Sequence, residues 1–346
     1  MLACEALRAA GWRAALYTSP HLVDVRERMM VDGQPIGAAG FATWTERLRP
    51  EIERTDASFF EATTAIAFAD FAARGADVAV VEVGLGGRLD STNVLTPLVS
   101  AVTHIALEHT AYLGTTLPAI AREKAGVAKP GVPFVVGEPD AALAAVLAEA
   151  ARSAGAAPVV RVPPEERYAG AVGLPGPHQR RNAAVAAAVL RALPRALRPH
   201  DDAITRGFAR ARLPGRYDRR GHWLFDVAHN PDGVHTLLAT LRALPPPGPL
   251  RALVSILDDK DWRTMLALLL ERVAELWVTT APSAPEARRW SLAAVEAEFR
   301  GRVRVEPDFD AAVAALRHAA GTVLVCGSFH TVGDVMARLP GFRPFG

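Results

Sequence analysis

The sequence is poor in cysteine, in long apolar runs and in net charge. Its two cysteines, Cys4 and Cys326, lie far apart and outside any metal-binding or redox motif, which predicts neither a disulfide framework nor a zinc site and suggests a reducing compartment. No apolar run reaches the roughly 18 residues of a membrane span, and the first residues lack the features of a signal peptide. The formal net charge is only +2, so no strong field attracts nucleic acid. These absences predict a cytoplasmic protein that binds neither nucleic acid nor membranes.

Lysine is also scarce. Lys124, Lys129 and Lys260 are the only lysines, although lysine and arginine together number 39. Arginine stays protonated, whereas lysine can lose its proton and be modified. Each retained lysine is therefore a weak candidate for chemistry that arginine cannot perform.

Strand patterns and helix patterns alternate along the chain. Residues 2–10 predict a helix and residues 12–17 a strand, which together form the second half of a βαβ unit. The helix from Ser58 has a capping box with Glu61 and ends at Gly75. Residues 77–84 and 98–107 are predicted as buried parallel strands. Because the alternation starts again near Arg216, we expect two α/β domains with parallel sheets, residues 1–215 and 216–346.

Ligands of open parallel sheets bind beyond the carboxyl ends of the strands, and this rule selects VEVGLGGRLDSTN first. Glu82 lies near the end of an apolar strand, where a carboxylate is costly unless it is paired or binds a cation. Gly84, Gly86 and Gly87 allow the backbone to approach a ligand closely. The alternative is an ordinary glycine-rich turn with Glu82 paired to Arg88.

The stretch HIALEHT follows the next predicted strand. His104 and His109 are an odd number of residues apart, so on a strand they would face opposite sides. His109 lies past the strand end and is the candidate for a site. His104 is interpreted as a core histidine.

Two further stretches are ambiguous when taken alone. Lys124 lies late in a predicted helix and can simply be a solvated helix end. Asp226 ends a strand and is followed by His229 and Asn230, a set able to contact a ribose or phosphates. Asn230 is also expected to cap the helix that Pro231 begins.

Taken in order, these stretches resemble one family. YTSPHLVDVRERMMVDGQPI, SFFEATTAIAF, VEVGLGGRLDSTNV, LEHTAYLG, IAREKAGVAKPGVP, PGRY, DVAHNP and DDKDW are similar to the folylpolyglutamate synthase and dihydrofolate synthase family of the Mur ligase superfamily. The resemblance implies an α/β fold, with a P-loop-type parallel-sheet ATPase domain followed by a smaller Rossmann-like domain. It also implies an ATP-dependent amide ligase that adds L-glutamate to dihydropteroate, to folylpoly-γ-glutamate or to both, through an acyl phosphate. ATP as co-substrate, Mg²⁺ and a monomeric protein are further expectations.

The resemblance also assigns roles to residues. Ser19, Glu82 and His109 would be magnesium ligands, and Lys124 would be the carbamylated lysine that acts with Glu82 and His109 in catalysis. The residues that would contact ATP are Asn182, Arg216, Asp226 and His229. Those that would form the pterin pocket are Ser58, Phe59, Phe60, Glu61, Leu89, Asp90 and Ser91.

The sequence departs from the family pattern at its beginning. The family has a strand and a glycine-rich phosphate loop before the helix that here starts at Met1, and no G-x-x-x-x-G-K-[ST] motif occurs in this chain. The missing strand predicts a gap or an exposed edge in the sheet. Either the start was assigned too far downstream, which the intact later motifs favour, or the truncation is real. A real truncation would leave an inactive folate- or nucleotide-binding remnant.

Two smaller points complete the comparison. Glu108 stands where the family has aspartate, one methylene shorter, which affects the surroundings of His109. A Mur ligase acting on a peptidoglycan precursor is the other alternative, and SFFEATTA and GLGGRLDSTN argue against it.

Overall fold

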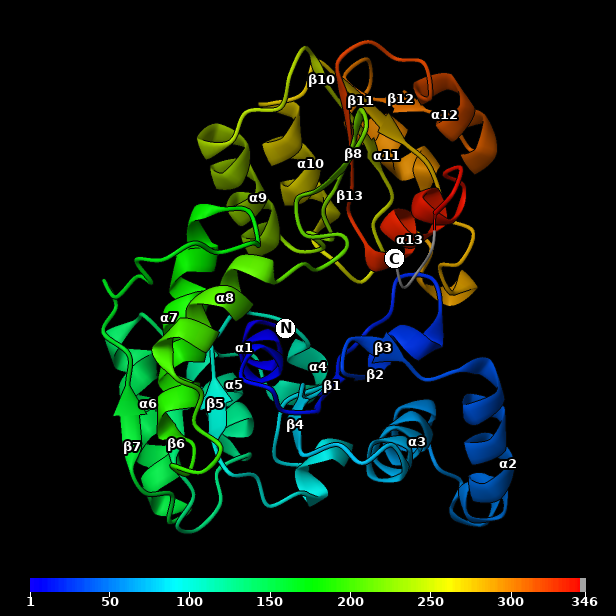
Figure 1. Ribbon diagram of the computed structural model, residues 1–346. Helices are drawn as coiled ribbons and strands as arrows, with labels where there is room; N and C mark the ends of the chain where they lie inside the picture. Colours follow the sequence, from blue (N-terminus) through cyan, green and yellow to red (C-terminus); the bar gives the residue numbers. More distant parts are fainter. Residues whose placement is uncertain (343–346) are drawn as a thin grey trace. The chain divides into compact units, whose positions relative to one another are not determined.

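The computed structural model describes residues 1–342, which divide into two compact units (Figure 1). The first unit comprises residues 1–21, 26–173 and 179–212. The second comprises residues 22–25, 174–178 and 213 onward. Two short segments that precede residue 213 therefore pack with the C-terminal unit.

The first unit contains two sheets. One has four strands in the order β3-β2-β1-β4, and the other has three parallel strands in the order β5-β6-β7. β1 pairs in parallel with β4, whereas β2 and β3 run antiparallel to their neighbours. The strands are β1 (Ala14–Tyr17), β2 (Met29–Val31), β3 (Gln34–Pro35), β4 (Val78–Val81), β5 (Ser100–Val102), β6 (Phe134–Val136) and β7 (Val159–Arg161).

The division into two sheets confirms the predicted gap. Within residues 1–342, β4 ends one sheet and β5 ends the other, and the two strands are not paired with each other. β4 is accordingly only partly buried, and Ala79 is exposed. The prediction of a buried strand over residues 77–84 is wrong on this point, because an edge strand is covered by a neighbour on one side only.

Helices pack on these sheets and connect their strands. They are α1 (Leu2–Ala9), α2 (Ala38–Thr55), α3 (Phe59–Ala73), α4 (Thr110–Leu113), α5 (Leu117–Ala125), α6 (Ala141–Ser153), α7 (Pro177–Ala192) and α8 (Asp201–Arg210), with 3₁₀ turns η1 (Val25–Arg28) and η2 (Ser91–Val94). One hydrophobic cluster joins β5 and β6 to α5 and α6, and another joins β1 and β2 to α3. The capping box of Ser58 and Glu61 at the start of α3 is confirmed.

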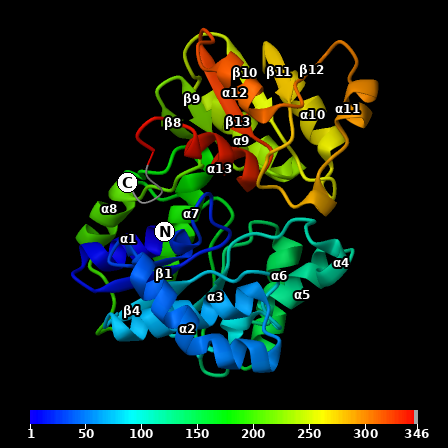
Figure 2. The same cartoon turned by 90° about the vertical axis from the view of Figure 1, so that its right-hand side faces the viewer.

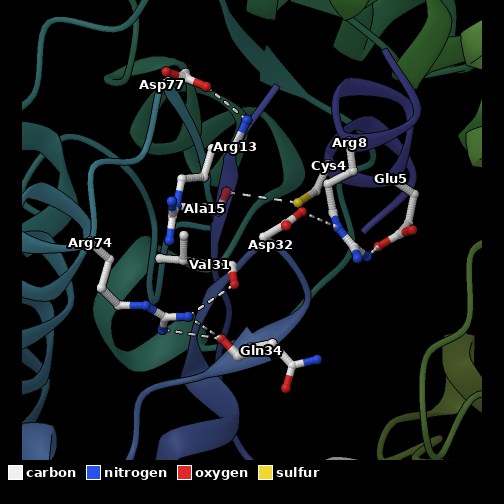
Figure 3. Close-up of polar contacts among 10 residues, drawn as sticks. All are labelled: Cys4, Glu5, Arg8, Arg13, Ala15, Val31, Asp32, Gln34, Arg74 and Asp77. Atoms are coloured by element: carbon white, nitrogen blue, oxygen red, sulfur yellow. Dashed lines mark hydrogen bonds and ion pairs between the residues drawn. The ribbon is translucent and has the colours of Figure 1, made fainter. Parts of the chain in front are cut away.

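Polar contacts fix α1 and the β2–β3 hairpin to the sheet (Figure 3). Arg8 of α1 forms ion pairs with Glu5, and with Asp32 of the hairpin turn at 3.1 Å. Arg74, just after α3, donates to the carbonyl oxygens of Val31 and Gln34. The hairpin is therefore bonded to α1 and to the residue after α3, and β2 also pairs with β1.

The second unit is a doubly wound domain. Its six-stranded sheet has the order β12-β11-β10-β13-β9-β8, and only β8 is antiparallel to its neighbour (Figure 2). The strands are β8 (Asp218–Arg220), β9 (Trp223–Phe225), β10 (Leu250–Val254), β11 (Glu275–Val278), β12 (Arg304–Val305) and β13 (Thr322–Cys326). The helices are α9 (Pro231–Ala243), α10 (Trp262–Leu270), α11 (Leu292–Glu298), α12 (Phe309–Leu316) and α13 (Phe329–Ala337), with the 3₁₀ turn η3 (Glu286–Arg288).

Alternate residues of each central strand enter different cores. Leu224 of β9 and Leu324 of β13 pack with α9, α10 and α11, whereas Phe225 and Val325 pack with α12 and α13. Helices therefore cover both faces of the sheet, which agrees with the Rossmann-like α/β class predicted from the sequence. Among the described residues, no helix is long and apolar enough to cross a membrane.

Candidate active site

Ser19 and Glu82 meet at the carboxyl ends of two paired strands. The parallel register sets Tyr17 opposite Val81, so the residues that follow β1 and β4 emerge side by side. The backbone N–H of Ser19 donates to Oε2 of Glu82 at 3.0 Å. Glu82 itself is exposed. Its carboxylate is not paired to Arg88, because Arg88 forms its ion pair with Glu123 at 3.1 Å.

The glycine-rich loop after β4 packs against three other elements. A Cβ on Gly84 would lie 2.4 Å from the ring of Phe60 in α3, and one on Gly86 would lie 2.8 Å from Leu113 in α4. A Cβ on Gly87 would lie 2.7 Å from the carbonyl oxygen of Lys124 in α5. These glycines therefore permit close approach. The loop brings predicted pocket and catalytic segments together within the first unit.

Asp90 holds this loop in shape. Its Oδ2 accepts hydrogen bonds from the N–H groups of Gly84 and Leu85 at 3.0 and 2.9 Å. Its Oδ1 accepts from the N–H and the hydroxyl of Thr92. Both carboxylate oxygens are thus engaged within the chain, which indicates a positioning function for this predicted pocket residue.

Lys124 is the last residue but one of α5 and is partly buried. Burial lowers the pKa of its ammonium group, and the negative charge of Glu108 opposes that shift. Glu108 immediately precedes His109, so Lys124 and the HIALEHT segment are electrostatic neighbours. A buried lysine loses its proton more readily than an exposed one.

The two histidines of HIALEHT lie outside any strand. β5 ends at Val102, so the alternation argument does not apply to His104 and His109. His109 caps α4 with a left-handed backbone, φ 52°. The interpretation of His104 as a core histidine is wrong, since its side chain is 50% exposed and contacts Oε2 of Glu138 at 3.1 Å.

The predicted pterin-pocket residues lie on the start of α3 and on the loop after β4. Phe59 and Leu89 are 61% and 81% exposed, which is unusual for large apolar side chains. Ser58 and Glu61 bond to each other's backbone N–H groups in the capping box. Ser91 begins η2 directly after Asp90.

Arg216 and His229 lie beside Phe329 in the second unit, and both interact electrostatically with Asp226. The guanidinium of Arg216 and the ring of His229 each lie 5.6 Å from the Phe329 ring. Asp226 accepts hydrogen bonds from the N–H groups of Tyr217 and Ala228, both at 3.0 Å. Burial raises the pKa of Asp226, and the charge of Arg216 opposes that shift. Asn230 caps α9 by accepting from Gly233 at 2.7 Å, as expected.

Asn182 belongs to the first unit, on α7, where its side-chain amide donates to Gln179 at 3.0 Å. Three of the four residues predicted to contact the nucleotide therefore lie together in the second unit. The fourth, Asn182, lies on a helix of the first unit.

Several residues that lie near the carboxyl ends of the strands were not predicted from the sequence. Glu138, only 2% exposed, follows β6 and also accepts from the N–H of Ile105 at 2.7 Å. Phe329 follows β13, and His178 has a buried Nδ1 without a partner among the described residues. Burial and the charge of Arg216 both lower the pKa of His178. Applying the carboxyl-end rule to every predicted strand would have selected Glu138 and Phe329.

Comparison with known proteins agrees with this geometry. Residues 212–329 match the family model described as Mur ligase, glutamate ligase domain. The dihydrofolate synthase/folylpolyglutamate synthase of Escherichia coli (strain K12) is 38% identical over 364 residues, covering 98% of this chain and 83% of that protein. The chain belongs to the dihydrofolate synthase/folylpolyglutamate synthase family.

Solved structures support the same assignment. E. coli FolC in complex with DHPP and ADP has a TM-score of 0.85 at 34% identity, covering 97% of this chain and 85% of that one. A bifunctional folylpolyglutamate synthase/dihydrofolate synthase with Mn, AMPPNP and L-glutamate bound has a TM-score of 0.84 at 35% identity, with coverage of 97% and 85%. As a family member, the chain is an ATP-dependent ligase that uses a divalent metal ion.

Proposed function

We propose that this ligase joins the amino group of L-glutamate to a carboxylate of dihydropteroate or of a folylpoly-γ-glutamate. The γ-phosphoryl group of ATP passes to a carboxylate oxygen of the acid and gives an acyl phosphate and ADP. The glutamate amine then attacks the acyl carbon, the amide bond forms, and phosphate leaves with the bonding electrons. The amine loses a proton as the amide forms.

Ser19, Glu82 and His109 are the residues proposed to hold Mg²⁺. Their donor set fits a hard cation in part, because a carboxylate and a hydroxyl are oxygen ligands and imidazole is a less usual one. No group of three or more His, Cys, Asp or Glu side chains suited to a metal occurs within residues 1–342. Phosphate oxygens and water would complete the coordination. A bound cation would neutralise charge on the transferring phosphoryl group.

Lys124 is proposed to carry a carbamate. This modification requires a neutral amine, and burial of Lys124 lowers the pKa of that amine. The carbamate converts a cation into an anion, which arginine cannot do. Lysine is scarce in this chain, so its presence at position 124 instead of arginine agrees with a chemical role.

Arg216, Asp226, His229 and Asn182 are proposed to contact the nucleotide. The guanidinium of Arg216 is suited to phosphate oxygens. Asp226 fixes the backbone of Tyr217 and Ala228 beside it and so shapes the loop on which Arg216 sits. The exposed Phe59 and Leu89 provide apolar surface for a pterin ring.

The packing of the Gly84–Gly87 loop against Phe60, Leu113 and the Lys124 carbonyl is the observation that carries this proposal. It groups the apolar, acidic and lysine-bearing segments in one unit. The test is ligation by the purified protein with ATP, Mg²⁺ and L-glutamate, with dihydropteroate and tetrahydrofolate compared as acids and products read by mass spectrometry.

Glu82→Gln keeps the acceptor for Ser19 but removes the charge, so turnover should fall by roughly 10- to 100-fold. Glu149→Gln, an acidic residue of α6 outside the site, is the matched control and should keep full activity. Equal activity of Glu82→Gln and Glu149→Gln would reject the assigned role of Glu82.

We also propose that the protein acts as a monomer in a reducing compartment. Both cysteines are buried and unpaired. Sedimentation should give a single species near 36.9 kDa, and a dimeric mass would contradict the proposal.

A further inference from the structure

A cavity lies in the first unit, beyond the outermost strand of the β5-β6-β7 sheet. We call it the β7 pocket. Its volume is about 610 Å³, within the range of roughly 300–1,000 Å³ that small-molecule sites occupy. It is formed by β7 and the loop of residues 162–170, by one face of α7, and by Thr205 of α8.

The β7 pocket lies at the edge of the sheet where ligands bind. The three strands are parallel, and Val102, Val136 and Arg161 are aligned at their carboxyl ends. The loop of residues 162–170 therefore leaves β7 at the same edge at which Glu138 leaves β6. In open parallel sheets this is the edge that carries binding sites.

Two arginines of α7 fix the wall of the pocket. Arg180 donates to the carbonyl oxygens of Tyr168 and Ala169 at 2.9 and 3.2 Å. Arg181 donates to the carbonyl oxygens of Gly137 and Val162 at 2.8 and 3.1 Å. These bonds tie the loop both to α7 and to the end of β6, so the cavity has a built wall.

The floor of the pocket is apolar. Ala184, Ala187 and Ala188 present one face of α7 with no side chain longer than a methyl group. Tyr168 stands at the side, packed edge-on against Phe208 with ring centroids 5.0 Å apart. Its hydroxyl group is 3.0 Å from Oγ1 of Thr205. This floor suits an aromatic ring.

The rim of the pocket is positively charged. It carries Arg161, Arg167 and Arg191 against the single carboxylate of Glu166. The side chain of Arg161 has no hydrogen bond or ion pair within the part of the chain that the structure describes. Arg191 has only a loose pair with Asp201 at 3.8 Å, and both of these side chains are exposed. Three guanidinium groups around one cavity favour an anion.

The β7 pocket is separate from the predicted ligase site. On α7, at about 100° per residue, the pocket residues Ala184, Ala187 and Ala188 lie on the face opposite Asn182. None of the residues assigned to glutamate ligation lines the cavity. A ligand here would therefore be additional to those of the proposed reaction.

We propose that the β7 pocket binds a small aromatic carboxylate, with its ring on the alanine face of α7 and its carboxylate between the guanidinium groups of Arg161 and Arg167.

The test is calorimetric titration of the full chain with 2-naphthoate, and with the neutral 2-naphthalenemethanol for comparison. Saturable 1:1 binding of the acid is expected, at least about tenfold tighter than the alcohol because charge-assisted hydrogen bonds are lost with the carboxylate. Equal affinity for the two compounds, or no saturable binding of the acid, would overturn the proposal.

Variants locate the site. The double change Arg161→Gln and Arg167→Gln should weaken 2-naphthoate binding at least tenfold, and Ala188→Leu, which fills the floor, should abolish it. Arg152→Gln, an exposed arginine of α6 outside the pocket, is the matched control and should bind like the original chain. Undiminished binding by both pocket variants, with circular dichroism showing them folded, would place the ligand elsewhere and reject the proposal.

Competition between folate and 2-naphthoate tests whether the natural ligand of the pocket resembles the acid substrate. Competitive displacement of 2-naphthoate by folate from the original chain would mean that the pocket takes a substrate-like acid. Absence of displacement, with 2-naphthoate binding intact, would assign the pocket to a different aromatic acid.

Discussion

At the scale of single residues, Asp90 has a different kind of function from its neighbours in the predicted pterin pocket. Its carboxylate accepts four hydrogen bonds from Gly84, Leu85 and Thr92. Asp90→Ala would leave those donors without a partner, so the free energy of unfolding should fall by about 1–3 kcal/mol. Urea titration of the purified variant measures this change.

Asp90→Asn is the control for that prediction, because it keeps one oxygen acceptor and should recover part of the loss. A stability of Asp90→Ala equal to that of the original chain would mean that water replaces the carboxylate without cost.

Lys124 offers a prediction that depends on pH. Carbamate formation needs the neutral amine, and burial lowers the pKa of Lys124 from the value of an exposed lysine. The neutral fraction, and with it the carbamate, should therefore increase as the pH rises through that lowered pKa. With ¹³C-bicarbonate, the original chain should give a carbamate signal in its NMR spectrum that grows with pH.

The matched variants separate Lys124 from the other lysines. Lys124→Arg should lose the signal and should lower ligation by roughly 10- to 100-fold. Lys129→Arg should keep both, since Lys129 donates to the carbonyl of Asn93 and lies outside the proposed set. A carbamate signal that survives in Lys124→Arg would contradict the assignment.

At the scale of elements, local signals predicted most of the helices but not α2, α4, α8 or α13, and they missed the antiparallel strands β2, β3 and β8. The capped and apolar-patterned α3 and the alanine-rich α6 could be predicted from sequence alone. No helix was predicted over α2, which contains Gly40 and Pro50, two residues that usually interrupt helices. The β2–β3 hairpin was also missed, although Asp32 and Gly33, both with positive φ, form the Asp-Gly turn that is the strongest short hairpin signal.

Ser58 allows the capping and binding functions of one element to be separated. Ser58→Ala removes the cap of α3 and should lower the free energy of unfolding by about 1 kcal/mol, whereas Ser58→Asn should retain it. If the Ser58 hydroxyl also contacts the folate substrate, both variants should raise KM for that substrate. Ser291→Ala removes the equivalent cap of α11 and should leave KM unchanged. A normal KM in both Ser58 variants would restrict Ser58 to capping.

At the scale of the whole molecule, the sequence predicts only those parts of the site that depend on residues adjacent in the chain. Glu82 and Asp226 were found because each follows its own strand, so the carboxyl-end rule needs no further information. The Glu82–Ser19 contact depends on the parallel pairing of β1 with β4, which joins residues 63 positions apart. The β7 pocket depends in the same way on β7, α7 and α8 meeting. Periodicity predicts elements, but it does not give the pairings that bring them together.

The second unit is expected to fold from residues 213–346, because both of its cores lie within that range. Two short segments outside the range, residues 22–25 and 174–178, also belong to it. In the first of them Leu22 packs against the core of α12 and α13, and a Cβ on Gly333 would lie 2.0 Å from the Leu22 carbonyl oxygen. The isolated fragment should therefore unfold cooperatively in urea, but at a lower midpoint than the same unit in the full chain. Leu22→Ala in the full chain should lower the stability of this unit by about 2 kcal/mol, the lower end for a buried leucine, while Val23→Ala, an exposed neighbour, should change it little. A fragment as stable as the unit in the full chain, or equal effects of the two variants, would show that the Leu22 segment contributes no packing energy.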